Sequence, residues 1–127
     1  MRALQAPPSL PIGIRVLRDA VIVMICIAAG GAAATLPYEP DPADPRMVEV
    51  FQAVFGTLGF ALTAFLARSR RGLHVLLTTL TVWAVAGVLM AMTGGNAIDW
   101  AIRLVLLALM ALLGGGLARL VERLARE

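Results

Sequence analysis

The chain has 127 residues, of which 60 % are hydrophobic and 15 % charged, and its mean hydropathy is +0.86. A soluble domain of this length keeps a large fraction of its surface exposed to water, so this composition excludes an ordinary soluble protein and predicts an integral membrane protein. The net charge is +3 and all eleven basic residues are arginines that lie between apolar segments, which indicates membrane orientation and excludes nucleic acid as a partner.

The N-terminal part of the chain divides into an irregular tail and a first apolar segment. Three prolines within residues 1–14 predict a cytoplasmic tail without regular structure. The first transmembrane helix is expected over residues 17–36, because Pro37 cannot continue it. Arg15 and Asp19 precede its apolar part with a spacing of four, which favours an ion pair on a helix.

Three further apolar segments follow and predict helices over residues 47–68, 73–93 and 98–125. A helix needs about 20 residues to cross the hydrocarbon core, and these segments are long enough. In lipid every backbone polar group must be paired within its own element, so each segment is expected to be helical. The predicted fold is therefore all-α, with one domain over residues 15–127 that packs four transmembrane helices as a compact bundle of two hairpins.

The arginines predict the orientation of this bundle. Nine of them lie in the tail, in the loop between the second and third segments and at the C-terminus: Arg2, Arg15, Arg18, Arg68, Arg70, Arg71, Arg119, Arg123 and Arg126. Arg46 and Arg103 lie in the remaining two loops. By the positive-inside rule, this distribution predicts an even number of crossings with both termini in the cytoplasm. The exclusive use of arginine is typical of a GC-rich bacterial genome, so we expect the inner membrane.

Small and polar residues recur at helical spacing within the apolar segments. Gly56, Gly59 and Thr63 share a face of the second segment, and Ala111 and Gly115 share one on the fourth. Such strips predict close helix packing, because lipid supplies no hydrophobic drive for helices to associate. The alternative is a polar helix face that lines a path through the bundle, with these residues: Gln52, Thr57, Thr63, Thr78 and Thr81.

The ionisable residues of the apolar segments lie near the predicted helix ends, where their side chains reach headgroups or water. Asp99 and Arg103 are four apart and predict an interfacial ion pair at the outer end of the last helix. His74 is expected at the inner interface, and as the single histidine it cannot form a bis-histidine haem site. We expect no metal and no cofactor. Trp83 falls in mid-segment and predicts packing, whereas Trp100 predicts an anchor at the outer interface.

The sequence has no pattern typical of catalysis, so we expect that the protein is not an enzyme. The predicted function is that of an accessory or structural subunit of a larger membrane complex. Its amphipathic end over residues 119–127 is the expected docking element. The alternative is a small homo-oligomeric channel or transporter for a small solute or ion. The expected partners are the lipid bilayer and other membrane subunits or further copies of the chain itself.

Overall fold

A computed structural model of the chain describes residues 11–36, 44–67 and 70–127. The described residues form four α-helices, which confirms the all-helical prediction and the number of helices. Their bounds are α1 Ile12–Thr35, α2 Pro45–Leu66, α3 Arg71–Met92 and α4 Ala97–Leu124.

Helix α1 begins earlier than predicted. It starts at Ile12, directly after Pro11, so the predicted irregular tail over residues 1–14 was too long. Ile12 and Ile14 are apolar and Gly13 has free space around it, so nothing at these positions stops the helix once Pro11 has been passed. The part of the tail prediction over residues 1–10 lies outside the described residues.

Local capping chemistry fixes the starts of α2 and α4. Asp44 precedes α2, and its side-chain oxygen accepts a hydrogen bond of 2.9 Å from the backbone N–H of Arg46. Asn96 does the same for α4 through the N–H of Ile98, also at 2.9 Å. These bonds satisfy N–H groups that have no partner inside the helix.

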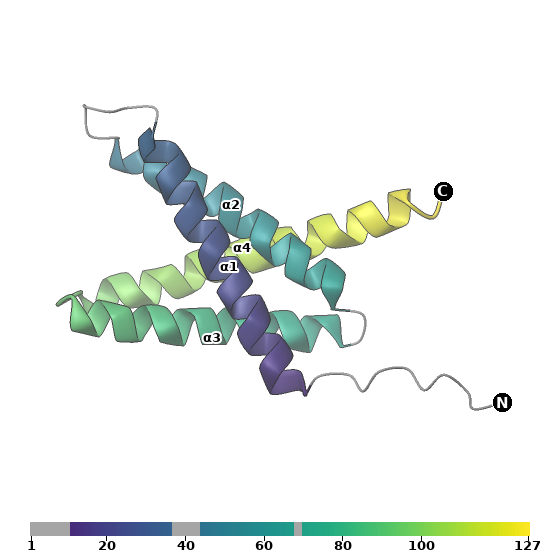
Figure 1. The fold of residues 1–127 in the computed structure, drawn as a ribbon, viewed down its shortest axis with the longest axis horizontal. Helices are drawn as coiled ribbons and strands as arrows, with labels where there is room; N and C mark the ends of the chain where they lie inside the picture. Colours follow the sequence, from purple (N-terminus) through teal and green to yellow (C-terminus); the bar gives the residue numbers. More distant parts are fainter. Residues whose placement is uncertain (1–10, 37–43, 68–69) are drawn as a thin grey trace.

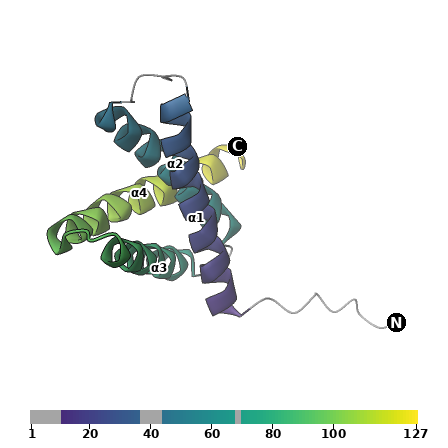
Figure 2. The ribbon, with the colours of Figure 1, turned by 60° about the vertical axis from the view of Figure 1, so that its left-hand side comes forward.

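The four helices form two hairpins that cross each other. Helices α1 and α2 lie side by side, as do α3 and α4, and the first hairpin runs obliquely over the second (Figures 1 and 2). In Figure 1 the start of α1, the end of α2, the start of α3 and the end of α4 all lie towards the right, and the four opposite ends lie towards the left. The chain therefore alternates between two sides of the molecule, as an up-and-down topology requires.

The core lies where the hairpins cross. It is formed by buried apolar residues from all four helices, namely Ala20, Val23, Phe60, Val82, Leu107 and Ala111. Glycines bring α2 close to its neighbours: a Cβ added at Gly30 of α1 would lie 2.5 Å from the carbonyl oxygen of Phe51 on α2. A Cβ added at Gly114 of α4 would lie 2.7 Å from the carbonyl oxygen of Thr57 on the same helix α2.

Three of the helices, α2, α3 and α4, are long and apolar enough to cross a membrane. Helix α1 is not among them, and it carries Arg15, Arg18 and Asp19 in its first turns. Large apolar side chains cover much of the outside; Leu112 is 73 % exposed and Leu113 is 65 % exposed. An exterior of this kind suggests a membrane protein, because a contiguous apolar surface is unfavourable in water.

Candidate functional site

A buried pair of ionisable side chains joins the two hairpins. Asp19 of α1 is hydrogen-bonded through Oδ2 to Nε2 of His74 on α3. The second carboxylate oxygen, Oδ1, accepts a hydrogen bond of 2.8 Å from Nε of Arg18. Asp19 is 0 % exposed and His74 is 5 % exposed, whereas the side chain of Arg18 is 45 % exposed. The carboxylate thus has a partner on each oxygen.

The helices place this pair for simple geometric reasons. On α1 the buried positions Val16, Ala20 and Val23 form the face that packs inward, and Asp19 lies on the same side of the helix. Ala20 is small, so α1 can approach its neighbours closely here. On α3 His74 and Thr78 are one turn apart and both are buried. The crossing of α1 over α3 brings the two faces together.

This arrangement corrects the prediction for both residues. Asp19 was expected to pair with Arg15, but its partners are Arg18 and His74. His74 was expected at the interface within reach of water, but it is buried between helices. The reasons are that α1 starts at Ile12, which puts Asp19 two turns inside the helix, and that the hairpins cross at this level. The spacing of residues in the sequence predicts which side chains are neighbours on one helix. It does not predict contacts between helices that are far apart in the chain.

Two further polar atoms at this end of the molecule are buried without a hydrogen-bond partner. They are the hydroxyl of Thr78, which is 0 % exposed, and Nε of Arg15. A buried polar group that lacks a partner costs about 1–3 kcal/mol, so such atoms are uncommon in folded proteins. Thr78 follows His74 by one turn, so the orphaned hydroxyl belongs to the surroundings of the buried pair.

The structure does not assemble the predicted polar face into a path. The hydroxyls of three of its threonines donate to carbonyl oxygens of their own helices: Thr57 to Ala53, Thr63 to Phe60 and Thr81 to Leu77. Gln52 lies beside Gly31 of α1, several turns from Thr63. Of the five residues, only Thr78 has a hydroxyl that is buried and unpaired.

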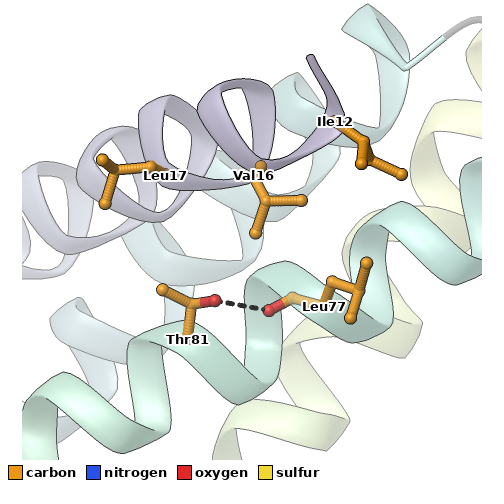
Figure 3. A pocket seen from close by; sticks show the side chains of 6 residues that line it. Ile12, Val16, Leu17, Leu77 and Thr81 are labelled. Atoms are coloured by element: carbon orange, nitrogen blue, oxygen red, sulfur yellow. Dashed lines mark hydrogen bonds between the residues drawn. The ribbon is translucent and has the colours of Figure 1, made fainter.

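A shallow groove of about 420 Å³ lies between α1 and α3, close to the buried pair (Figure 3). Ile12, Val16 and Leu17 line it from α1, and Leu77 and Thr81 line it from α3. The hydroxyl of Thr81 donates to the carbonyl of Leu77 at 2.8 Å, so its hydrogen-bonding capacity is used within the helix (Figure 3). The walls are therefore apolar, and the groove does not provide a polar binding site.

The predicted ion pair between Asp99 and Arg103 is not formed. Both side chains are exposed, and neither belongs to the ion pairs among the described residues. A different pair, which the sequence did not indicate, joins the start of α3 to the end of α4. Arg71 NH1 donates to Glu122 Oε2 at 2.9 Å, and its NH2 bonds the other carboxylate oxygen. Residues on different helices, 51 positions apart in the chain, give no local signal.

Two tryptophans interlock at the other end of the second hairpin. The rings of Trp83 and Trp100 are stacked with their centroids 4.1 Å apart and an interplanar angle of 3°. Each indole N–H donates to the backbone carbonyl of the other residue at 3.0 Å. Trp83 packs against the core as predicted. The ring of Trp100, which the sequence predicts as an anchor at the outer interface, packs against Trp83 of α3.

The fold and the site define a small all-helical protein with three helices fit to cross a membrane and a buried carboxylate–imidazole pair at the crossing of its hairpins. Among the residues that the structure describes, no group of three or more histidine, cysteine or acidic side chains could hold a metal ion. No family model, no curated protein and no solved structure matches this chain. The chemistry available at the site is the binding and release of a proton, since an imidazole and a carboxylate both accept one.

Proposed function

We propose that this chain is a four-pass protein of the bacterial inner membrane and serves as a non-catalytic subunit of a larger membrane complex. Helix α1 is the fourth crossing in this proposal. It has 24 residues and is about 36 Å long at 1.5 Å per residue, which exceeds the hydrocarbon core of about 30 Å. Its two ends lie on the same two sides of the molecule as the ends of α2, α3 and α4 (Figure 1). Arg15 and Arg18 then lie at the headgroups, which long basic side chains can reach.

The orientation follows from the positions of the arginines on the helices. The start of α1, the start of α3 and the end of α4 carry most of the arginines and lie on one side of the molecule. The positive-inside rule assigns that side to the cytoplasm. Both termini are cytoplasmic in this proposal, and Arg103 lies near the outer surface.

The observation that carries the subunit proposal is the C-terminal end of α4. This helix has 28 residues and is about 42 Å long, so about two turns exceed what the hydrocarbon core requires. In Figure 1 its end extends beyond the neighbouring helices. Leu120, Val121 and Leu124 are exposed there by 53 %, 47 % and 62 %. Glu122 on the other face is tied to Arg71, so the apolar face points away from the bundle and is available to a partner.

The test is gentle detergent extraction from the native host, followed by native mass analysis. We expect the chain to co-purify in defined stoichiometry with larger, unrelated membrane proteins. The double variant Leu120→Gln with Leu124→Gln should lose that association. Ile98→Gln, at an equally exposed apolar position at the opposite end of α4, is the control and should keep it. Recovery of a homogeneous homo-oligomer alone would contradict the subunit proposal.

A second candidate function is a small homo-oligomeric channel or transporter. The buried pair Asp19–His74 favours it, because ionisable residues inside a membrane domain are costly and often belong to ion or proton pathways. Purified homo-oligomer in liposomes would then show uptake or flux that is lost in Asp19→Asn. A path lined by the predicted polar face requires that Gln52→Leu or Thr81→Val abolish the flux as well.

A further inference from the structure

We propose that Asp19 and His74 form a proton-binding site at the crossing of α1 and α3, which takes up one proton from the aqueous phase and thereby fastens the two hairpins together. The inference uses only the geometry of the pair and is independent of whether the chain acts as a subunit or as a transporter. The ligand is the proton, and the site consists of one carboxylate and one imidazole on different hairpins.

The charge of the buried groups supports one bound proton. With a neutral imidazole and an ionised carboxylate, the buried pair has a net charge of −1. With one more proton on the ring, the pair is an imidazolium and a carboxylate whose charges cancel. A buried net charge is much less favourable than a hydrogen-bonded pair of opposite charges. Arg18 compensates the carboxylate only in part, because its side chain is 45 % exposed and solvent screens its charge.

The other charged groups at this end of the molecule do not change the net charge of the buried pair. Arg71 of α3 is neutralised by Glu122 of α4. The ionisable side chains of α2 are Arg46 and Glu49 at its start, on the side of the molecule opposite the pair, so α2 brings no charge to the pair. The remaining basic residues at this end of the described chain, whose charges oppose a further proton, are Arg15, Arg18, Arg70, Arg119, Arg123 and Arg126. The carboxylate of Asp19 is the one acidic group directly bonded to the ring, so it provides the preference for the protonated form.

The hydrogen bonds define how the proton binds. Arg18 and His74 each bond one carboxylate oxygen of Asp19, so the proposal assigns the incoming proton to the ring of His74. The imidazole has two nitrogens: Nε2–H donates to Oδ2, and the lone pair of Nδ1 accepts the proton. The donor is hydronium, which is left as water, and no electron is transferred. The hydroxyl of Thr78, one turn further along α3, is also buried and has no hydrogen-bond partner.

The experiment uses the fact that the chain contains one histidine. The full chain is labelled with isotopic histidine, reconstituted into lipid nanodiscs and followed by nitrogen NMR between about pH 5 and pH 9, a range around the ordinary histidine value of about 6.5. We expect one set of ring signals that shows the imidazolium form in the folded wild type within this range, and a different pH response of these signals in Asp19→Asn. Asp99→Asn removes an exposed, unpaired carboxylate and should titrate like the wild type.

The fastening is tested by thermal unfolding in the same nanodiscs. Asp19→Asn and His74→Gln should each lower the melting temperature, and the double variant should be little worse than either single one, because both remove the same bond. Additive losses would contradict the fastening. If the variants fail to fold, the wild-type titration decides alone: a ring that stays neutral down to about pH 5, below the ordinary histidine value of about 6.5, would overturn the proposal. Identical titrations of the wild type and Asp19→Asn would overturn it as well.

Discussion

The packing of Trp100 of α4 against α3 depends on a single residue, Gly87. A Cβ added at Gly87 would lie 2.6 Å from Nε1 of Trp100, the atom that donates to the carbonyl of Trp83. The stacked tryptophans therefore depend on the absence of a side chain one turn after Trp83. Gly115 of α4 is also helical, but nothing lies within 4 Å of the position of its missing Cβ.

The two glycines give opposite predictions for the same substitution. Alanine is favoured over glycine in a helix by about 1 kcal/mol, so Gly115→Ala should be neutral or stabilising. Gly87→Ala should be destabilising, because the clash with the indole costs about 1–3 kcal/mol and exceeds that gain. Melting temperature in detergent and the tryptophan circular dichroism signal measure both effects. A stabilised Gly87→Ala with an unchanged tryptophan signal would contradict the packing described for this pair.

Neighbouring leucines of α4 also differ in environment. Leu106 is 52 % exposed and should accept Leu106→Phe without loss of stability. Leu107 is 5 % exposed and belongs to the core, so it does not face lipid. Leu107→Phe should cost about 1–3 kcal/mol, because a packed core cannot take up the larger ring without strain. Equal melting temperatures for the two variants would show that the buried face of α4 is assigned wrongly.

At the scale of the helices, α2 is the element on which two others pack. Gly59 faces Cys26 and Val23 of α1, and a Cβ there would lie 3.3 Å from the backbone Cα of Val23. Gly56 faces Ile27 of α1 and Met110 of α4. This face of α2 is the one that its glycine spacing predicts. On α4 the predicted face is confirmed at Ala111, which is buried, but the glycine that packs against α2 is Gly114, and Gly115 is open.

Larger residues in this face should separate the helices. We expect Gly59→Leu and Gly56→Leu to lower the melting temperature strongly, because a side chain must be accommodated where α1 and α4 already touch α2. Gly116→Leu provides the control, since its position is open. Size-exclusion profiles and thermal unfolding in detergent report both outcomes. Should all three variants unfold at the same temperature, α2 would not be the packing centre.

At the scale of the whole molecule, the proposed orientation predicts which loops are accessible from which side. Reporter fusions after Asp44 and Gly95 should give a periplasmic signal, and a fusion after Gly72 should give a cytoplasmic one. The α1 crossing is tested most directly by the Asp44 fusion, because α1 is the helix with charged residues in its first turns. A cytoplasmic signal from Asp44 would place both ends of α1 on the inner side.

The sequence by itself determined the elements. Four apolar segments, separated by prolines, glycines and arginines, correspond to four helices that start within about five residues of the predicted positions. These features are local: a helix depends on the apolar character of a continuous segment and on residues that can or cannot continue it. The largest difference lies at the start of α1, where three prolines predict an irregular tail over residues 1–14, whereas the helix begins directly after the last of them, Pro11.

Only the tertiary structure decided which side chains meet. The crossing of the hairpins buries Asp19 against His74, which both lie near helix starts in the sequence. It also leaves three of the four threonines of the predicted polar face bonded to their own helices, and the hydroxyl of Thr78 unpaired. The angle at which two helices cross depends on how all contacting side chains fit together at once, and the glycines that permit close approach lie far apart in the chain. Spacing along one helix shows which residues share a face, but the partner of that face is set by packing across the whole molecule.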